Sequence, residues 1–374
     1  MPPQTRGWNL FFKVPPQTRD RDLSFTARPT DTPVPSTMES DNLMKLNIDK
    51  KKKYFLLGTG ILWVALAAFL SGKSPLPTQA VPLSQVSPPG GLCGTFNPYS
   101  SLSVPTQITR IGDDYFLVDC YHNQILTSTS PETPLSEWQV MTDLINRGHT
   151  IAGDGTVCLA DDTENNRILV FQKIKGRYFL SQVLENIGLR PHYVCYDQEE
   201  ERFLALSSMT GELYVFRRSP DSCAVALEKI LSIPELEGVY VRSFTLDGDD
   251  IYFPACNGTI LRTGKEDLTV LERFAVPEQY AGMVQVSRIQ DKYYITVSTD
   301  LWGDPSHATI LQAEDLSRLD RARDISSCFG GAGTPYYISS FDGSYFLTKH
   351  CDDIGVFSFI PGEEGPEQVH ALHP

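Results

Sequence analysis

From Cys93 to the end of the 374-residue chain, one short pattern recurs about every 45 positions. Each copy has an alternating strand, an Asp/Gly turn, a second strand, a polar bend and a third strand, with room for a fourth. In the second copy, Gly153-Asp-Gly precedes the strand from Val157, and the bend Asn165-Asn-Arg precedes the strand from Ile168. A sheet this small cannot bury both of its faces alone, so neighbouring copies must stack on one another.

The spacing of the copies predicts the number of sheets. The points taken as equivalent are Asp119, Asp161, Leu206, Ala255, Val297 and Lys349. They lie 42, 45, 49, 42 and 52 residues apart, and the 282 residues from Cys93 onward divide into six units of 47. We therefore predict an all-β domain, a six-bladed β-propeller over residues 93–374. Helix signals are scarce in it, and the strongest predicts a short helix within Glu137–Asn146.

The second copy also resembles the NHL repeat, whose consensus has Ala-Asp, then Asn-Asn-Arg-Ile, then Val-Phe. The matching residues are Ala160-Asp161, Asn165-Asn-Arg167-Ile168 and Val170-Phe171. By this resemblance the chain looks like a divergent member of the NHL/SMP-30-like group of six-bladed propellers. That group includes binding scaffolds, lactonases and lyases, so the resemblance does not choose a function.

Residues 54–72 form an uncharged, mostly apolar run that is long enough, as a helix of about 28 Å, to cross a bilayer. Four lysines, Lys50 to Lys53, precede this run, and only Lys73 follows it closely. The positive-inside rule then predicts a single-pass signal-anchor with a cytoplasmic N-terminus and an extracytoplasmic propeller at the cell membrane. Cleavage near Ala80 would instead release a secreted protein.

The residues around this run have no periodic pattern. Residues 1–53 are predicted to be a disordered cytoplasmic tail. Met44-Lys-Leu begins an ordinary signal-anchor layout, so Met44 is an alternative start, which would make the first 43 residues an upstream stretch without function. Residues 73–92 are rich in proline and predict a stiff stalk between the membrane and the propeller.

The charge of the chain is unevenly distributed. Of its 32 Lys/Arg and 46 Asp/Glu residues, 21 and 40 lie after residue 92, which makes the predicted propeller strongly acidic. An acidic body repels phosphate backbones, so we expect no nucleic-acid partner. We expect the membrane to be a partner through residues 54–72, together with a peptide, carbohydrate or protein ligand.

Propellers bind ligands over the central channel, where the innermost strands begin. The repeat predicts which side chains meet there, and a long loop in the fifth copy adds an exposed aromatic residue. These candidate ligand-binding residues are Gln107, His149, His192, Arg242, Gln285, Tyr336, Tyr337 and, from the loop, Trp302. Arg242 could bind a carboxylate or a sugar acid, and the alternative is that these residues are simply polar where strands meet solvent.

His149 and His192 could also hold a divalent metal, which is the only cofactor that the sequence suggests. The resemblance implies that related lyases use several channel histidines and that related lactonases use acidic and amide ligands. Neither set is complete, although His122 and His350 follow second strands and could approach the mouth. Three functions therefore stay open: a binding module, a metal-dependent lyase or lactonase, and a structural component of an envelope complex. No catalytic residue is assigned.

Two further residue types have simpler interpretations. The acidic groups at Asp113-Asp114, Asp154, Asp247 and Asp342 fall between the first and second strands of their copies, where Asp-Gly forms a tight hairpin, so we interpret them as turns rather than calcium ligands. The eight cysteines permit disulfides in an exported domain, but their spacing predicts few of them.

Overall fold

The computed structural model of the chain describes residues 79–80 and 91–373. The predicted tail (1–53), the predicted anchor (54–72) and the predicted stalk, apart from residues 79–80 and 91–92, lie outside the described residues. Within the described ranges, no helix has both the length and the apolar character needed to cross a membrane.

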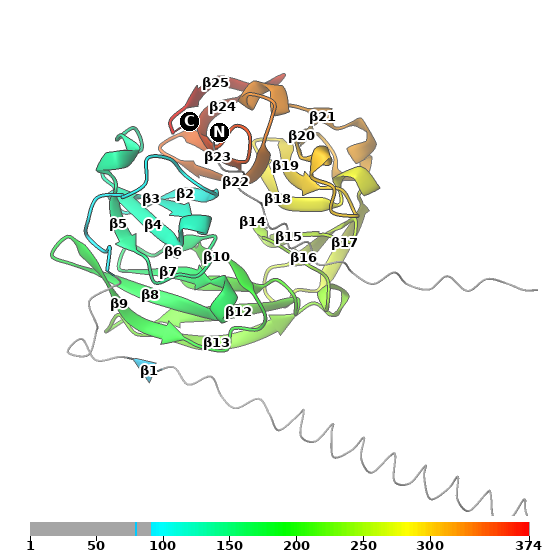
Figure 1. The fold of residues 1–374 in the computed structure, drawn as a ribbon. Helices are drawn as coiled ribbons and strands as arrows, with labels where there is room; N and C mark the ends of the chain where they lie inside the picture. Colours follow the sequence, from blue (N-terminus) through cyan, green and yellow to red (C-terminus); the bar gives the residue numbers. More distant parts are fainter. Residues whose placement is uncertain (1–78, 81–90, 374) are drawn as a thin grey trace, which may run out of the picture. The chain divides into compact units, whose positions relative to one another are not determined.

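Six antiparallel sheets follow one another along the chain and form a ring (Figure 1). Blade 1 comprises β2 (Pro105–Ile111), β3 (Asp114–Asp119), β4 (Gln124–Ser128) and β5 (Gln139–Thr142). Blade 2 comprises β6 (Ile151–Gly153), β7 (Val157–Asp162), β8 (Arg167–Ile174) and β9 (Arg177–Leu184), with β1 (Gln79–Ala80) paired to its outer edge. Blade 3 comprises β10 (Pro191–Asp197), β11 (Arg202–Ser207), β12 (Glu212–Arg218) and β13 (Val225–Ser232).

The remaining three sheets have the same plan. Blade 4 comprises β14 (Thr245–Asp247), β15 (Asp250–Ala255), β16 (Thr259–Gly264) and β17 (Val270–Ala275). Blade 5 comprises β18 (Gly282–Ile289), β19 (Lys292–Thr299), β20 (Thr309–Ala313) and β21 (Arg323–Asp324). Blade 6 comprises β22 (Thr334–Phe341), β23 (Ser344–His350), β24 (Gly355–Gly362) and β25 (Gly365–Ala371). The predicted all-β, six-bladed propeller is confirmed.

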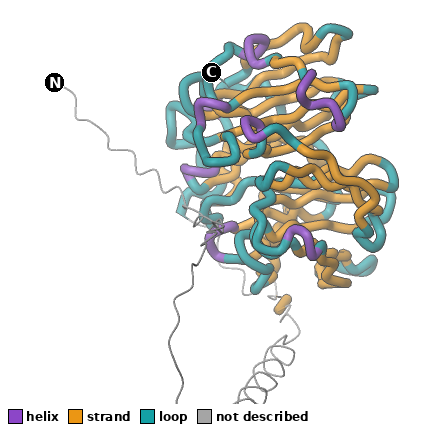
Figure 2. The backbone as a smooth tube through the Cα atoms, turned by 90° about the vertical axis from the view of Figure 1, so that its right-hand side faces the viewer, coloured by secondary structure: helices purple, strands orange, loops and turns teal. Residues whose placement is uncertain are grey.

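The helical segments of the described chain are short 3-10 turns between strands (Figure 2). They are η2 (Cys120–His122), η3 (Leu135–Glu137), η4 (Thr163–Asn165), η5 (Pro234–Leu236), η6 (Glu278–Tyr280), η7 (Pro305–His307), η8 (Leu316–Arg321) and η9 (Ser326–Phe329). The helix predicted within Glu137–Asn146 is wrong, because Gln139–Thr142 forms the fourth strand of blade 1. Val140 and Met141 are buried there, and a segment around Phe96 pairs with the strand from its other side.

The first strand of each blade is the innermost and the fourth the outermost. Because consecutive strands are antiparallel, the starts of the inner strands lie on the same face of the ring as the loops between second and third strands. We call this the mouth face. The opposite face carries the hairpins between first and second strands, and we call it the turn face.

Apolar side chains fill the seams between blades. Between blades 3 and 4, for example, Leu206 and Val215 of one sheet pack with Ile251 and Phe253 of the next, and all four are almost completely buried. Each sheet thus buries the faces that it could not bury alone, as the repeat predicted.

The ring closes between blades 1 and 6 without sharing a strand, since each of these blades uses one continuous stretch of chain. Leu117 of blade 1 lies in one apolar cluster with Phe346 of blade 6. The Thr348 hydroxyl donates to the Thr106 carbonyl oxygen at 2.7 Å across the same seam. Side-chain packing therefore closes the ring.

The acidic hairpins of the turn face also bridge the seams. Gly112, Gly248 and Gly343 take positive φ values in these hairpins, which supports their interpretation as turns. In addition, five of the blades each contribute one aspartate on this face that pairs with a basic residue of the next blade. The pairs are Asp114–Lys173, Asp154–Arg218, Asp197–Lys265, Asp247–Arg288 and Asp342–Arg110. At the seam between blades 5 and 6, Lys292 and Arg323 donate instead to the carbonyl oxygens of Glu363 and Glu364.

One sequence equivalence is wrong by a single residue. Asp119 was matched with Asp161, but its structural counterpart is Asp162. Both Asp119 and Asp162 precede a three-residue 3-10 turn that ends in a left-handed asparagine, Asn123 or Asn166, each with φ of 54°. The extra aspartate in blade 2 has a different role, which bears on the mouth.

Candidate functional site

Backbone bulges direct the inner-strand side chains at the mouth. The pairing of first and second strands shifts at Thr106, His192, Val284 and the Tyr336-Tyr337 pair, each near the start of an inner strand. A bulge breaks the alternation of side chains and turns a residue out of the sheet. In blade 4, Arg242 follows an isolated bridge at Val241 and precedes β14, so it also lies outside the regular ladder.

Three aromatic rings from three different blades stack at the mouth. The imidazoles of His149 and His192 lie 3.6 Å apart between centroids and are nearly parallel. The ring of Tyr336 stacks beside them, 5.7 Å from His149 and 6.4 Å from His192. His350 follows at 5.9 Å from Tyr336. Blades 2, 3 and 6 therefore meet over the axis.

The extra aspartate of blade 2 holds His149 in place. Asp161 is fully buried and accepts hydrogen bonds from the backbone N–H groups of His149 and Thr150 at 2.9 and 2.6 Å. Nδ1 of His149 lies 3.0 Å from Oγ1 of Thr163, whose hydroxyl in turn donates to Asp161. Nε2 of the same ring lies 3.6 Å from the Cys120 sulfur. Both ring nitrogens of His149 therefore have protein partners.

His192 is equally well satisfied. Its Nδ1 lies 3.2 Å from the Arg242 carbonyl oxygen and 3.0 Å from the Tyr337 hydroxyl, and its Nε2 lies 3.1 Å from the Tyr240 hydroxyl. The network assigns the proton to Nδ1, which donates to the carbonyl, and leaves Nε2 to accept from Tyr240.

Tyr337 closes the channel beneath this stack. It belongs to blade 6, yet its hydroxyl donates to the Arg242 carbonyl oxygen at 2.9 Å and contacts His192 in blade 3, on the opposite side of the ring. Its ring packs edge-on against Tyr193 at 5.0 Å. Tyr337 is 1% exposed. The mouth is thus a filled surface at this depth.

Arg242 supplies the positive charge of the mouth. Its guanidinium lies over the Tyr240 ring at 5.2 Å and donates to the Gly282 carbonyl oxygen at 3.3 Å and to the Ser298 hydroxyl. Arg190 lies nearby and is paired with Glu164 at 2.7 Å.

The histidines of the mouth are neutral near pH 7. Burial lowers the pKa of His149. Burial, then repulsion between the protonated forms of the two imidazoles and repulsion from Arg242, hold the pKa of His192 well below its usual range. Burial and the Arg242 charge lower the pKa of His350 to about 4. Burial also raises the pKa of Tyr336 well above its ordinary value, so its phenol keeps its proton.

The structure does not bring every predicted residue into the stack at the centre of the mouth. The Gln107 amide oxygen accepts from the backbone N–H of Ile151 at 2.8 Å, and the Gln285 amide oxygen accepts from that of Ile338 at 2.7 Å. Both glutamines therefore brace the inner strand of the next blade. Trp302 lies in the loop between β19 and β20, is 81% exposed and stacks on none of the described aromatic rings.

The histidine pair does not have the form of a metal site. Rings that stack face to face direct their nitrogens side by side, whereas metal ligands aim their lone pairs at one point. A metal would also have to displace the Tyr240 and Thr163 hydroxyls from the ring nitrogens. Across residues 91–373, no three or more His, Cys, Asp or Glu side chains gather as they would around an ion.

Sequence reasoning missed Tyr240 and Arg190. A signal was present for Arg190, because Arg147-Gly-His149 and Arg190-Pro-His192 repeat the same spacing in adjacent blades. The structure explains this repeat. The left-handed Asn123 and Asn166 accept hydrogen bonds from the backbone N–H groups of Arg147 and Arg190, at 2.9 and 2.7 Å.

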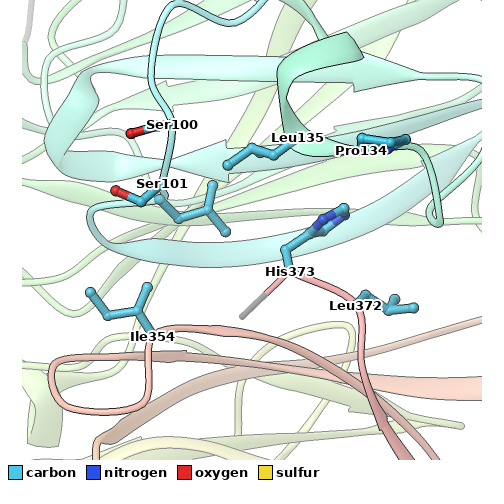
Figure 3. Close-up of a pocket in the computed structure, with 8 residues that line it drawn as sticks. Ser100, Ser101, Pro134, Leu135, Ile354, Leu372 and His373 are labelled. Carbon is cyan, nitrogen blue, oxygen red and sulfur yellow. The ribbon is translucent and has the colours of Figure 1, made fainter.

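Two hollows of the described chain lie away from the mouth centre. The larger, about 270 Å³, lies near the seam of blades 1 and 6 among Leu102, Leu135, Ile354 and Leu372, with His373 at its side (Figure 3). The smaller, about 160 Å³, lies between the outer edges of blades 1 and 2. Neither hollow is lined by any of the candidate ligand-binding residues.

No protein-family model and no curated protein matches this sequence. Solved structures do match its fold. A candidate 6-phosphogluconolactonase from Bacteroides uniformis has a TM-score of 0.50 at 11% identity, over 70% of this chain and 81% of its own. A candidate 6-phosphogluconolactonase from Bacteroides fragilis has a TM-score of 0.51 at 12% identity over the same shares. A streptogramin B lyase has a TM-score of 0.51 at 11% identity, over 74% of this chain and 84% of its own. At these identities the likeness establishes the propeller fold, which is also what the NHL/SMP-30-like resemblance implied.

Proposed function

We propose that the chain is a membrane-anchored recognition module whose propeller binds a peptide, carbohydrate or protein ligand on its mouth face, outside the cytoplasm. The filled mouth carries this proposal. Sites for small-molecule chemistry are usually deep, enclosed pockets, whereas partner-binding surfaces are shallow and rich in Tyr, Trp and Arg. With Tyr337 across the axis and the ring nitrogens of His149 and His192 occupied, the mouth is of the second kind.

The rim of the mouth face fits a docking surface. Tyr121 is 56% exposed and lies against the Arg147 guanidinium at 4.8 Å. Tyr99 is 37% exposed and stacks on His122 at 3.6 Å. With Trp302, these residues place large aromatic side chains in loops of one face. Rigid aromatic groups beside cations are the side chains that most often anchor a partner.

Binding of the purified full-length chain to glycan and peptide arrays tests this proposal. We expect Tyr121→Ala combined with Trp302→Ala to weaken binding at least tenfold. Leu271→Ala is the matched control, because Leu271 is 52% exposed on the outer strand β17 of blade 4. Binding that survives the mouth-face substitutions but is lost with Leu271→Ala would contradict the proposal.

A second candidate function is that of a metal-dependent lactonase or lyase. It is favoured by the likeness of the fold to proteins named as a candidate lactonase and a lyase, and a metal bound by the histidines would have to displace the Tyr240 and Thr163 hydroxyls. Metal content and hydrolysis of a simple lactone, each measured with and without added divalent metal, separate the two functions. Activity that needs metal and is lost in His149→Ala/His192→Ala would favour the enzyme.

A further inference from the structure

Arg242 is a cation without a paired anion. Other partly or fully buried arginines of the propeller have carboxylate partners: Arg202 pairs with Asp197 and Glu266, and Arg190 pairs with Glu164. The contacts of Arg242 are instead a carbonyl oxygen, a serine hydroxyl and the Tyr240 side chain. No carboxylate of residues 91–373 forms an ion pair with it. A sheltered charge in this state is costly unless an anion joins it.

The Tyr336 hydroxyl is the second unused group. Its ring is 8% exposed and held by the stack with His149 and His192, so its position is set by packing. The phenol has no hydrogen-bond partner among the described side chains and backbone groups. The Tyr336 ring stacks 6.4 Å from His192, whose Nε2 contacts the Tyr240 hydroxyl, and the Arg242 guanidinium lies over the Tyr240 ring. Tyr336 and Arg242 therefore flank the same two side chains, His192 and Tyr240.

We propose that Arg242 and Tyr336 form a carboxylate-binding site at the centre of the mouth. This inference rests on the proposed recognition function and names the chemical group that is recognised. A carboxylate has two acceptor oxygens, and the pair offers a charged N–H donor and a neutral O–H donor to meet them. The bound carboxylate would supply the counter-charge that Arg242 lacks.

The local charge favours a carboxylate over a phosphate. The neighbouring arginine, Arg190, is already neutralised by Glu164, and the neighbouring histidines are neutral. The buried Asp161 lies 3.8 Å from Nδ1 of His149 and adds a negative charge below the stack. Arg147 lies at the rim beside Tyr121, so Arg242 leaves one unpaired positive charge at the centre of the mouth. That charge matches a monoanion, whereas a phosphate with nearly two charges would leave an excess of negative charge.

Titration of the full-length chain with four small probes tests this site. D-glucuronate and N-acetylglycine each carry a carboxylate, and D-glucose and N-acetylglycinamide are their uncharged counterparts. We expect the carboxylates to bind and the uncharged probes to bind at least tenfold more weakly. The tighter of the two carboxylates identifies the source of the group, a sugar acid or a peptide terminus. Inorganic phosphate that binds more tightly than both carboxylates would overturn the assignment.

Variants distinguish this site from binding elsewhere. Arg242→Gln should weaken carboxylate binding at least tenfold and Tyr336→Phe about fivefold. Arg288→Gln, which removes an exposed arginine from the turn face, should leave binding unchanged. If circular dichroism shows that Arg242→Gln does not fold, Arg242→Lys, which keeps the charge, replaces it in this test. Carboxylate binding that is equal in all variants would overturn this site and leave the mouth-face proposal standing. Array binding that is insensitive to Tyr121 and Trp302 would overturn that proposal instead.

Discussion

Replacement of Asp197 by Asn should destabilise the propeller strongly, because this carboxylate holds a buried ionic network across the seam of blades 3 and 4. Its Oδ2 lies 3.2 Å from Nε of Arg202 and 3.4 Å from Nζ of Lys265. The side chains of Asp197, Arg202 and Lys265 are only 3%, 4% and 6% exposed. Asn has nearly the same shape, so the substitution removes charge without opening a cavity.

The magnitude follows from these distances. At an effective dielectric constant of about 20, each pair gains about 5 kcal/mol of Coulomb energy, and loss of the carboxylate leaves two buried cations. Removal of one partner of a buried ion pair typically costs about 3–5 kcal/mol. The exposed carboxylates of Glu199 and Glu266 still reach the cations, each about 3 Å away, so we expect the lower end, about 3 kcal/mol. For a domain of 282 residues, with an unfolding entropy of about 2.1 cal/mol/K per residue, that is a fall in Tm of roughly 5 °C.

Urea and thermal unfolding, followed by circular dichroism, measure this loss. Asp342→Asn is the matched control, because Asp342 also bridges a seam on the turn face but its side chain and that of Arg110 are 35% and 36% exposed. Exposed pairs contribute about 1 kcal/mol or less, so its Tm should fall by only about 2 °C. A fall of the same size in both variants would refute the argument from burial.

Two further predictions concern acid sensitivity and thiol reactivity. His149, His192 and His350 have lowered pKa values in the fold, so the unfolded chain binds more protons than the folded chain below pH 6.5. The free energy of unfolding should therefore fall on acidification. Each histidine contributes a fall of about 1.4 kcal/mol per pH unit between pH 6.5 and its folded pKa, which for His350 is about 4. Equal urea midpoints at pH 7.5 and pH 5 would contradict this. All eight cysteines are free, and only Cys328 and Cys351 are exposed, so two thiols should react rapidly with a disulfide reagent in the native protein and eight in denaturant. Fewer than eight in denaturant would reveal a disulfide.

The sequence carried the architecture and the sites where the inner strands begin, but not how the side chains there are used. The repeat identified His149, His192, Arg242 and the Tyr336-Tyr337 pair, and the structure brings all of them together. The repeat could not distinguish these residues from Gln285, which also lies near the start of an inner strand but accepts a hydrogen bond from the backbone of the next blade. Strand periodicity describes one sheet at a time, and a bulge or a bond to the next blade leaves no periodic trace.

The sequence alone determined the number of blades. Six copies of a short amphipathic sheet follow one another from Cys93 onward, and each copy must stack on its neighbours to bury its faces. The tertiary structure alone decided what the mouth is. Tyr337 and His192 lie 145 residues apart and on opposite blades, and they meet only because the ring closes. That closure fills the channel, occupies the histidine nitrogens and leaves Arg242 unpaired. Local chemistry cannot foresee these outcomes, because each depends on contacts across the axis between residues that are distant in the chain.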